Sequence, residues 1–176
     1  MKAIRGRTAI ILGTGLVAAV LLIVAGTRIA SQDEAGGEHR ASSESRLDAL
    51  VRHRRASMKQ IGKRMRAVIA FAKGGPGSFE EVAAHASVIK AIAEQMPEMF
   101  PEGSGMDDKL SVETGALPEI WVDWASFTKQ AEILSVEASK LKDIAETGDR
   151  SSLQEQFMSL GRNGCSNCHE AYREKI

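Results

Sequence analysis

Apolar side chains recur every three or four residues in four separate segments of this 176-residue chain, which is the spacing of amphipathic helices. No segment shows the alternation of apolar and polar residues that is typical of a strand. The whole chain has only four prolines, so long helices are allowed. The spacing predicts helices from about residue 45 to 73, from 78 to 96, from 118 to 147, and from about 151 onward.

Several of these helix ends carry local signals. Ser78 and Glu81 have the spacing of a capping box, and Pro118 suits the first turn of the third helix. "GGPG" follows the first helix, Pro97 stops the second, and Gly148 closes the third. We therefore predict an all-α fold, an antiparallel four-helix bundle over residues 45–176.

The N-terminal 30 residues predict a signal peptide or a membrane anchor. Lys2, Arg5 and Arg7 precede the uncharged stretch 8–26, which is longer than a usual signal-peptide core and just long enough to span a bilayer. In both cases the basic end stays in the cytoplasm and the body is exported. We expect a periplasmic protein, tethered to the inner membrane if the anchor is retained. The polar, small residues 31–44 predict a linker.

The net charge of zero hides an uneven distribution. Residues 1–30 have four basic side chains and no acidic one, and the remainder has 19 basic and 23 acidic side chains, a net charge of −4. General nucleic-acid binding needs a basic domain, so this composition argues against it. The expected partners are proteins or small molecules.

The two cysteines of the chain lie together near its C-terminus, in "GCSNCHEAYREK". On a helix, Cys165 and Cys168 share a face and His169 projects beside them. C-x-x-C-H is the sequence mark of covalent c-type haem attachment, and an exported chain is where such attachment is expected. The motif predicts one haem c per chain, held by two thioethers and one imidazole ligand.

Three other readings of the motif remain. A thioredoxin-like redox pair would need strands that the sequence does not predict. A structural zinc site would need four ligands, so His53 or His85 would have to join from elsewhere. A buried, inert pair would leave the adjacent His169 unexplained.

At this point the sequence resembles the cytochrome c-prime family, the class II c-type cytochromes. The resemblance covers roughly residues 45–176 and rests on "GCSNCHEAYREK" at the end, on "FPEGSG", "LPEIW" and "ASF" in the middle, and on "RRASMKQIGKRM" in the first helix. It implies that Cys165 and Cys168 form the thioethers and that His169 is the proximal iron ligand. It further implies that Arg54 lies near a haem propionate and that Arg173 tunes the haem pocket electrostatically.

The resemblance also implies a choice of function at Met58, which matches the distal position. A Met-ligated subgroup of the family has six-coordinate, low-spin haem and carries electrons. In other members the distal residue cannot ligate iron, and the five-coordinate, high-spin haem binds nitric oxide or carbon monoxide. From spacing alone a methionine on the core stripe of a helix is more often a packing residue than an iron ligand, and Met65, two turns further, is the competing candidate.

We expect a periplasmic electron carrier, not an enzyme, with His169 and Met58 as axial ligands and redox proteins as partners. The alternative is a high-spin, gas-binding protein, and family members of that kind are often dimers through the first helix. A third hypothesis is a non-redox structural membrane protein whose cysteines form a disulfide or a metal site.

Overall fold

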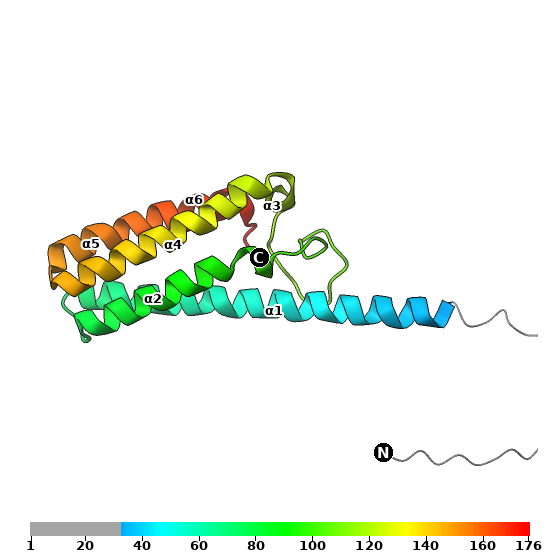
Figure 1. Cartoon of the computed structure of the whole chain (residues 1–176), viewed down its shortest axis with the longest axis horizontal. Coiled ribbons are helices and arrows are strands. Elements are labelled where there is room, and N and C mark those ends of the chain that lie inside the picture. The colour runs from blue at the N-terminus through cyan, green and yellow to red at the C-terminus, as the bar shows by residue number, and fades with distance from the viewer. Residues whose placement is uncertain (1–32) are drawn as a thin grey trace, which may run out of the picture.

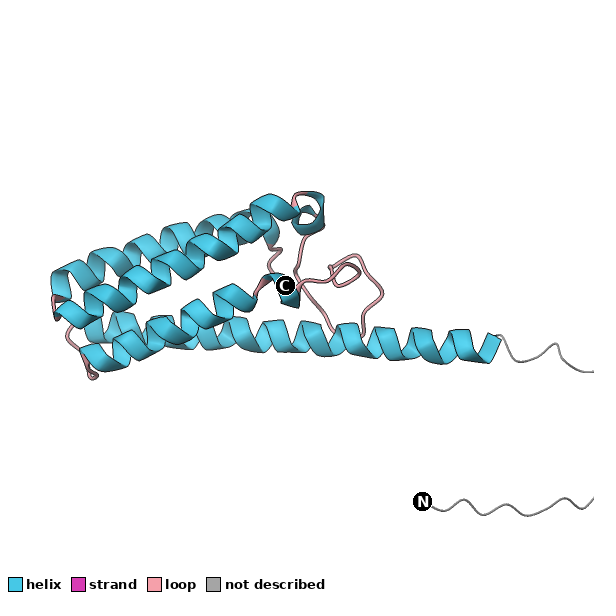
Figure 2. Cartoon of the chain, viewed as in Figure 1, coloured by secondary structure: helices cyan, strands magenta, loops and turns pink. Residues whose placement is uncertain are grey.

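The computed structural model describes residues 33–176, including the side chains of residues 46–176. The described part is helical, with loops between the helices and no strand (Figures 1 and 2). The long helices are α1 (Asp33–Ala72), α2 (Phe79–Gln95), α4 (Trp124–Thr147) and α5 (Arg150–Ser159). The short elements are η1 (Pro97–Met99), α3 (Glu119–Val122), the π-helical η2 (Leu160–Ser166) and α6 (Asn167–Tyr172).

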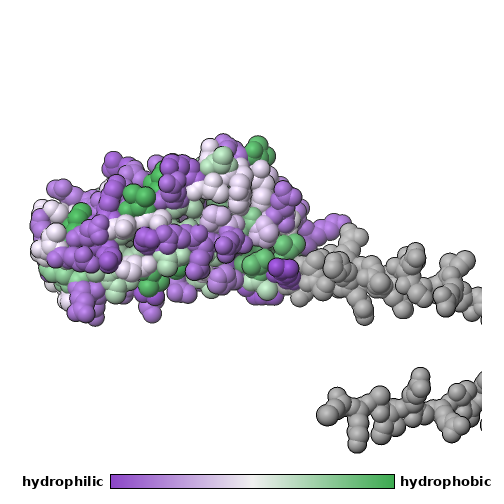
Figure 3. Space-filling model, in the orientation of Figure 1, coloured by the Kyte–Doolittle hydropathy of each residue, from purple (hydrophilic) through white to green (hydrophobic). Residues whose placement is uncertain are grey.

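The long helices form the predicted four-helix bundle. α2 packs against α1 and α4, α4 also packs against α5 and η2, and α5 returns to α1. Each helix contributes a fully buried side chain to one continuous core, namely Val68, Ile89, Leu141 and Leu153. Hydrophilic side chains predominate on the outer surface that Figure 3 shows. The apolar stripes thus account for the bundle, since each helix buries its stripe against two neighbours.

The helix α1 begins at Asp33, about a dozen residues before the predicted start near residue 45, so the predicted linker over residues 31–44 is helical from residue 33 onward. This part of α1 extends past the end of the bundle (Figure 1). The segment contains Ala, Glu and Arg, which are good helix formers, between its glycines. Adding residues to an existing helix avoids the cost of nucleation, and a composition typical of a tether can therefore become helical.

The third predicted helix is interrupted rather than continuous. Asp123 has φ −127° and ψ 68°, which separates α3 from α4. Its side chain accepts a hydrogen bond from the Ser126 main-chain N–H at 3.1 Å and so caps the N-terminus of α4. Trp124, the first residue of α4 after this break, is 39% exposed.

Two predicted helix boundaries are confirmed. Ser78 and Glu81 form the capping box at the start of α2, with the Ser78 hydroxyl accepting from Glu81 N and the Glu81 carboxylate accepting from Ser78 N. Gly148 ends α4 with φ 74°, a left-handed conformation that favours glycine. These signals act within a few residues, which is why the sequence predicted them.

Within residues 33–176, no helix has both the length and the hydropathy needed to cross a membrane. The predicted signal peptide or anchor lies in residues 1–30, outside the described residues.

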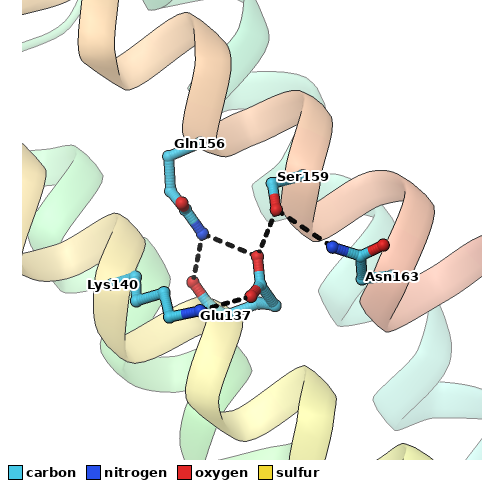
Figure 4. Close-up of polar contacts among 5 residues, drawn as sticks. All are labelled: Glu137, Lys140, Gln156, Ser159 and Asn163. Carbon is cyan, nitrogen blue, oxygen red and sulfur yellow. Dashed lines mark hydrogen bonds and ion pairs between the residues drawn. The ribbon is translucent and has the colours of Figure 1, made fainter.

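A buried carboxylate joins α4 to the C-terminal helices (Figure 4). Glu137 accepts hydrogen bonds from Lys140 Nζ at 2.8 Å, Gln156 Nε2 at 2.9 Å and Ser159 Oγ at 2.6 Å. Asn163 Nδ2 donates to the same Ser159 hydroxyl at 3.1 Å. Burial by itself raises the pKa of the Glu137 carboxyl, but these hydrogen bonds outweigh burial and hold the pKa below its ordinary value. The ionised carboxylate therefore fastens α5 to α4.

We expect Glu137→Gln to lower the free energy of unfolding by about 1–3 kcal/mol at pH 7, because hydrogen bonds to a buried charged group are lost. A depressed pKa contributes stability above the ordinary carboxyl pKa, and this contribution disappears as the pH falls through the folded-state value. The wild type should therefore lose more stability than the variant below about pH 4.5, as measured by denaturant unfolding across pH. Glu132→Gln is the control, since Glu132 pairs with Lys129 on the exposed surface. Equal losses in both variants would contradict this role of Glu137.

Candidate functional site

A cavity of about 590 Å³ opens at one end of the bundle. Its walls come from α1, α4, the η2–α6 segment and the loop that connects η1 to α3. All six residues that the sequence singled out line it: Arg54, Met58, Cys165, Cys168, His169 and Arg173. The fold therefore brings the first helix and the C-terminal motif, which are far apart in the sequence, to one cavity.

The sequence predicted that both cysteines lie on one regular α-helix, and this prediction is wrong. Cys165 belongs to the π-helical turn η2 and Cys168 to the following helix α6. Both thiols still line the cavity beside His169. π-helical turns inside α-helices are frequent at functional sites, and here the turn lies where the helix presents its motif to the cavity.

Gly164 allows η2 to approach α4 closely. A Cβ atom at this position would lie 2.8 Å from Leu134 Cδ1 and 3.2 Å from Leu134 Cα. The second distance involves main chain, so a side-chain rotation alone cannot relieve the overlap. Gly164 is thus a site residue that the sequence analysis missed, and its place directly before the first cysteine was the signal that could have found it.

We expect Gly164→Ala to destabilise the folded protein by about 1–3 kcal/mol, because η2 must move away from Leu134. Chemical unfolding followed by circular dichroism measures this loss. Gly161→Ala is the matched control, since a Cβ on this glycine of the same turn meets nothing within 4 Å. An equal loss of stability in Gly161→Ala would contradict this explanation, because it would show that any substitution in this turn is destabilising.

The environment keeps the cysteines and the histidine uncharged. Burial raises the pKa of the Cys165 thiol, and burial together with the neighbouring Cys165 raises the pKa of Cys168 to about 11. Burial, and secondarily the positive charge of Arg173, lower the pKa of His169. A neutral imidazole keeps a lone pair for a metal ion at pH 7. Neutral, buried thiols are poorly suited to act as reactive thiolates.

Arg54 lies almost completely buried at the rim of the cavity, with 3% of its surface exposed. Its guanidinium donates to Ser104 Oγ at 2.9 Å, to the Ser104 carbonyl and to Thr114 Oγ1 at 2.5 Å, and it stacks 4.6 Å above the centre of the Phe100 ring. Burial lowers the pKa of Arg54 to about 10, so it remains charged at neutral pH. Among residues 46–176, no carboxylate forms an ion pair with it. The site therefore holds a buried positive charge that an anionic group of a ligand would balance.

The loop over the cavity is held in place at several points. Asp48 on α1 accepts hydrogen bonds from the main-chain N–H and the hydroxyl of Ser111, which fixes the loop to α1 together with Arg54. Leu117 N donates to the Tyr172 carbonyl at 3.1 Å, and Glu174 N donates to the Gly115 carbonyl at 2.9 Å. This short pairing positions Arg173 at the cavity, although its side chain is exposed.

Met58 and Met65 both line the cavity from α1 and are half-buried. The structure thus leaves both side chains near the same space, and the sequence-based preference for Met58 as the distal residue stays a prediction. Gly62 lies between them on the cavity wall, and a Cβ there would meet only the tip of Arg66. The small residue widens the cavity next to Met58.

The remaining wall is mostly apolar, which suits a macrocycle with a hydrophobic face. Phe100, Phe127 and Tyr172 form a set of rings with centroids 4.8 Å and 5.4 Å apart. One polar exception is Gln130, whose buried Oε1 finds no hydrogen-bond partner among the described residues. The sequence analysis did not single out Gln130, because a lone glutamine on an amphipathic helix carries no motif.

The described structure gives no support to a disulfide or a zinc site at the cysteine motif. Cys165 and Cys168 form no disulfide with each other. Within residues 33–176, His, Cys, Asp and Glu side chains form no group of three or more that could hold a metal ion. His53 and His85, the residues that a zinc site would need, do not line the cavity.

The residues present fit haem c. Cys165 and Cys168 would hold it by two thioethers, His169 would supply an imidazole ligand, and the Arg54 guanidinium would face an acidic edge group. Bound in this way, haem c supplies an iron that exchanges single electrons or binds small gases. Most of the surrounding side chains are apolar, and burial favours the neutral form of His169.

A four-helix bundle that presents two cysteines and a histidine to such a cavity defines an all-helical c-type cytochrome. The family model described as Cytochrome C' matches residues 49–173. The chain belongs to the cytochrome c' family, and it carries one covalently attached haem c.

Two relatives illustrate the match in sequence. Cytochrome c' of Pararhodospirillum photometricum is 34% identical over 128 residues, which cover 72% of this chain and 98% of the relative. Cytochrome c-556 of Agrobacterium tumefaciens (strain II Chrys) is also 34% identical over 128 residues, covering 71% of this chain and 97% of the relative.

Solved structures show the same fold. Cytochrome c' from Thermochromatium tepidum aligns with a TM-score of 0.66 and 26% identity, over 73% of this chain and 97% of its own. A nitric oxide complex of a mutant cytochrome c prime from Alcaligenes xylosoxidans aligns with a TM-score of 0.63 and 26% identity, also over 73% and 97%. Both alignments confirm the predicted bundle.

Proposed function

We propose that this protein is a low-spin cytochrome that carries single electrons, with His169 as the proximal and Met58 as the distal iron ligand. The observation that carries the proposal is the position of Met58, which lines the haem cavity from α1 while His169 lines it from α6. A thioether on one side and an imidazole on the other are the two ligands of a six-coordinate haem. The resemblance of "RRASMKQIGKRM" to the Met-ligated subgroup supports the same assignment.

This ligand set has chemical consequences. A methionine thioether favours ferrous iron, so the reduction potential is higher than with imidazole ligation alone. An iron with both axial positions filled has no free position for a substrate. The function would then be outer-sphere electron transfer and not catalysis. Arg54 and Arg173 then act electrostatically, because positive charge near the haem disfavours the ferric form.

The second candidate function is gas binding at a five-coordinate haem. The observation that favours it is the nitric oxide complex of a mutant cytochrome c prime, a protein of the same fold. In that case Met58 packs against the core and leaves the distal iron position open. A homodimer through α1 would accompany this function by analogy with other family members.

The cellular setting belongs to the same proposal. A basic N-terminal end followed by the uncharged residues 8–26 supports export to the periplasm, with a retained segment anchoring the protein to the inner membrane. The electron donors and acceptors would be redox proteins. Nucleic acid is not an expected partner, since residues 31–176 carry a net charge of −4.

The absorption spectrum of the haem-loaded protein tests the proposal, recorded for both oxidation states with and without carbon monoxide. A low-spin spectrum with the weak far-red band of sulfur-to-iron ligation, unchanged by the gas, would support electron transfer. A high-spin spectrum that shifts with carbon monoxide would replace it with gas binding.

A further inference from the structure

Charge is strongly segregated between the part of α1 from residue 46 onward and the rest of the bundle. Residues 46–73 have nine basic side chains and one acidic side chain, a net charge of +8. Residues 74–176 have nine basic and eighteen acidic side chains, a net charge of −9. The overall balance of the chain therefore conceals a basic stretch of α1, from residue 46 onward, on an otherwise acidic body, and such a stretch has its own electrostatic field.

Four of the basic side chains form one exposed row on α1, which we call the basic stripe: Arg55, Lys59, Lys63 and Arg66. They are three or four residues apart, so they lie above one another on a single helix face. None of the ion pairs among residues 46–176 involves them. Arg55 donates to the main-chain carbonyl of Glu113 at 2.7 Å, a contact that leaves its charge uncompensated.

The basic stripe borders the haem cavity. Arg55, Lys59 and Arg66 themselves line the cavity, next to Met58 and Gly62 on the same helix. A structural role in the bundle does not require this arrangement, because the core stripe of α1 lies on another face. The row of positive charge therefore lies along the α1 wall of the cavity in which an electron would enter or leave.

We propose that the basic stripe is the docking surface for an acidic redox protein, which it steers to the haem edge. The inference rests on the proposed electron-transfer function and adds the location and the charge of the partner. Opposite charge raises the rate of productive encounters by about 10- to 1000-fold at low salt. The acidic body of this protein repels the same partner elsewhere, so it directs the partner to α1.

Two other occupants fit the charges less well. An anionic membrane surface would also meet the acidic residues of the neighbouring helices, because a flat bilayer contacts a broad area. A second copy of this chain offers acidic side chains, but they are spread over residues 74–176 rather than collected opposite one row. Both occupants are distinguished by the experiment below.

The test measures how fast two small oxidants of opposite charge oxidise the full-length, haem-loaded ferrous protein in neutral detergent. Each encounter passes one electron to hexacyanoferrate(III), an anion, or to tris(phenanthroline)cobalt(III), a cation, and no bond breaks and no proton moves. The double variant Lys59→Glu with Lys63→Glu should react about tenfold more slowly with the anion and faster with the cation at low salt. At about 1 M salt the differences should nearly vanish, because the Debye length is then about 3 Å.

The matched control is Lys129→Glu with Lys142→Glu, which makes the same change of charge on α4 at two residues that do not line the cavity. It should leave both rates within about twofold of the wild type. A change in reduction potential alone would change the oxidation rates with both oxidants in the same direction. Rate changes of opposite sign therefore identify electrostatic steering. Equal effects of the two double variants would overturn the proposal.

The nature of the partner is tested with polyglutamate, a model for an acidic protein surface. It should slow the oxidation of the wild type by hexacyanoferrate(III) at low salt and leave the Lys59→Glu, Lys63→Glu variant unaffected. Slowing by phosphatidylglycerol mixed micelles but not by polyglutamate would assign the stripe to a membrane instead. Sedimentation that shows a wild-type dimer, dissociated by the double variant, would assign it to a second copy.

The proposed function can fail separately. A high-spin spectrum that shifts with carbon monoxide would refute electron carriage whatever the oxidation rates show. A low-spin spectrum, combined with oxidation rates that do not change in the Lys59→Glu, Lys63→Glu variant, would refute only the docking surface.

Discussion

Replacing Met58 with leucine is expected to convert the ferric haem from low-spin to high-spin and to make the ferrous haem bind carbon monoxide. Leucine has a similar volume but no sulfur, so it removes the proposed ligand while it preserves the packing of α1. The fold should therefore lose less than about 1.5 kcal/mol of stability. Absorption spectra of both oxidation states, with and without the gas, measure the change together with a denaturant unfolding curve.

Met65→Leu is the matched control for this experiment. Met65 lines the same cavity from the same helix and is half-buried like Met58. We expect its spectrum to remain that of the wild type. A high-spin Met65 variant beside a low-spin Met58 variant would move the ligand to Met65, and two unchanged spectra would show that neither methionine binds the iron.

Replacing Arg54 with methionine is expected to destabilise the protein by about 1–3 kcal/mol and to lower its reduction potential. The first effect arises because the Ser104 carbonyl would lose its donor in a buried position. The second arises because the variant lacks a positive charge that disfavours ferric iron. Unfolding curves and a potentiometric titration measure the two effects independently.

Two variants separate the charge of Arg54 from its geometry. Arg54→Lys keeps the positive charge but replaces the planar guanidinium with an ammonium group, which cannot make the same set of hydrogen bonds. Its reduction potential should therefore stay close to that of the wild type, while its free energy of unfolding should fall. Arg52→Met removes an exposed arginine of α1 that does not line the cavity and should change stability by no more than about 0.5 kcal/mol. A potential that does not respond to Arg54→Met would show that this charge acts only on the loop.

The candidate site could be predicted from the sequence only where its signals are local. The C-x-x-C-H motif identified Cys165, Cys168 and His169 without any knowledge of the fold, because their chemistry depends on a spacing of a few residues. Met58, Arg54 and Arg173 came from the family resemblance instead. The structure brings these residues to one cavity, and their roles toward the haem stay predictions that the variants above test.

Other parts of the site depend on contacts between distant segments. Nothing in the sequence around Glu137 indicates that Ser159 and Gln156 will surround it. Likewise, the acceptors of Arg54 lie 50 and 60 residues away in the loop. Such partners meet only when helices have packed, and single-residue propensities carry no information about them.

The sequence by itself determined the helical class, the bundle, most helix boundaries and the attachment motif. Apolar periodicity, capping residues and the cysteine spacing all act within a few turns of one helix, so they survive without tertiary information. Tertiary structure alone decided the break at Asp123 and the π-helical turn that carries Cys165. It also decided that the basic stripe borders the cavity, because the distance between a surface charge and a site is set by how whole helices pack.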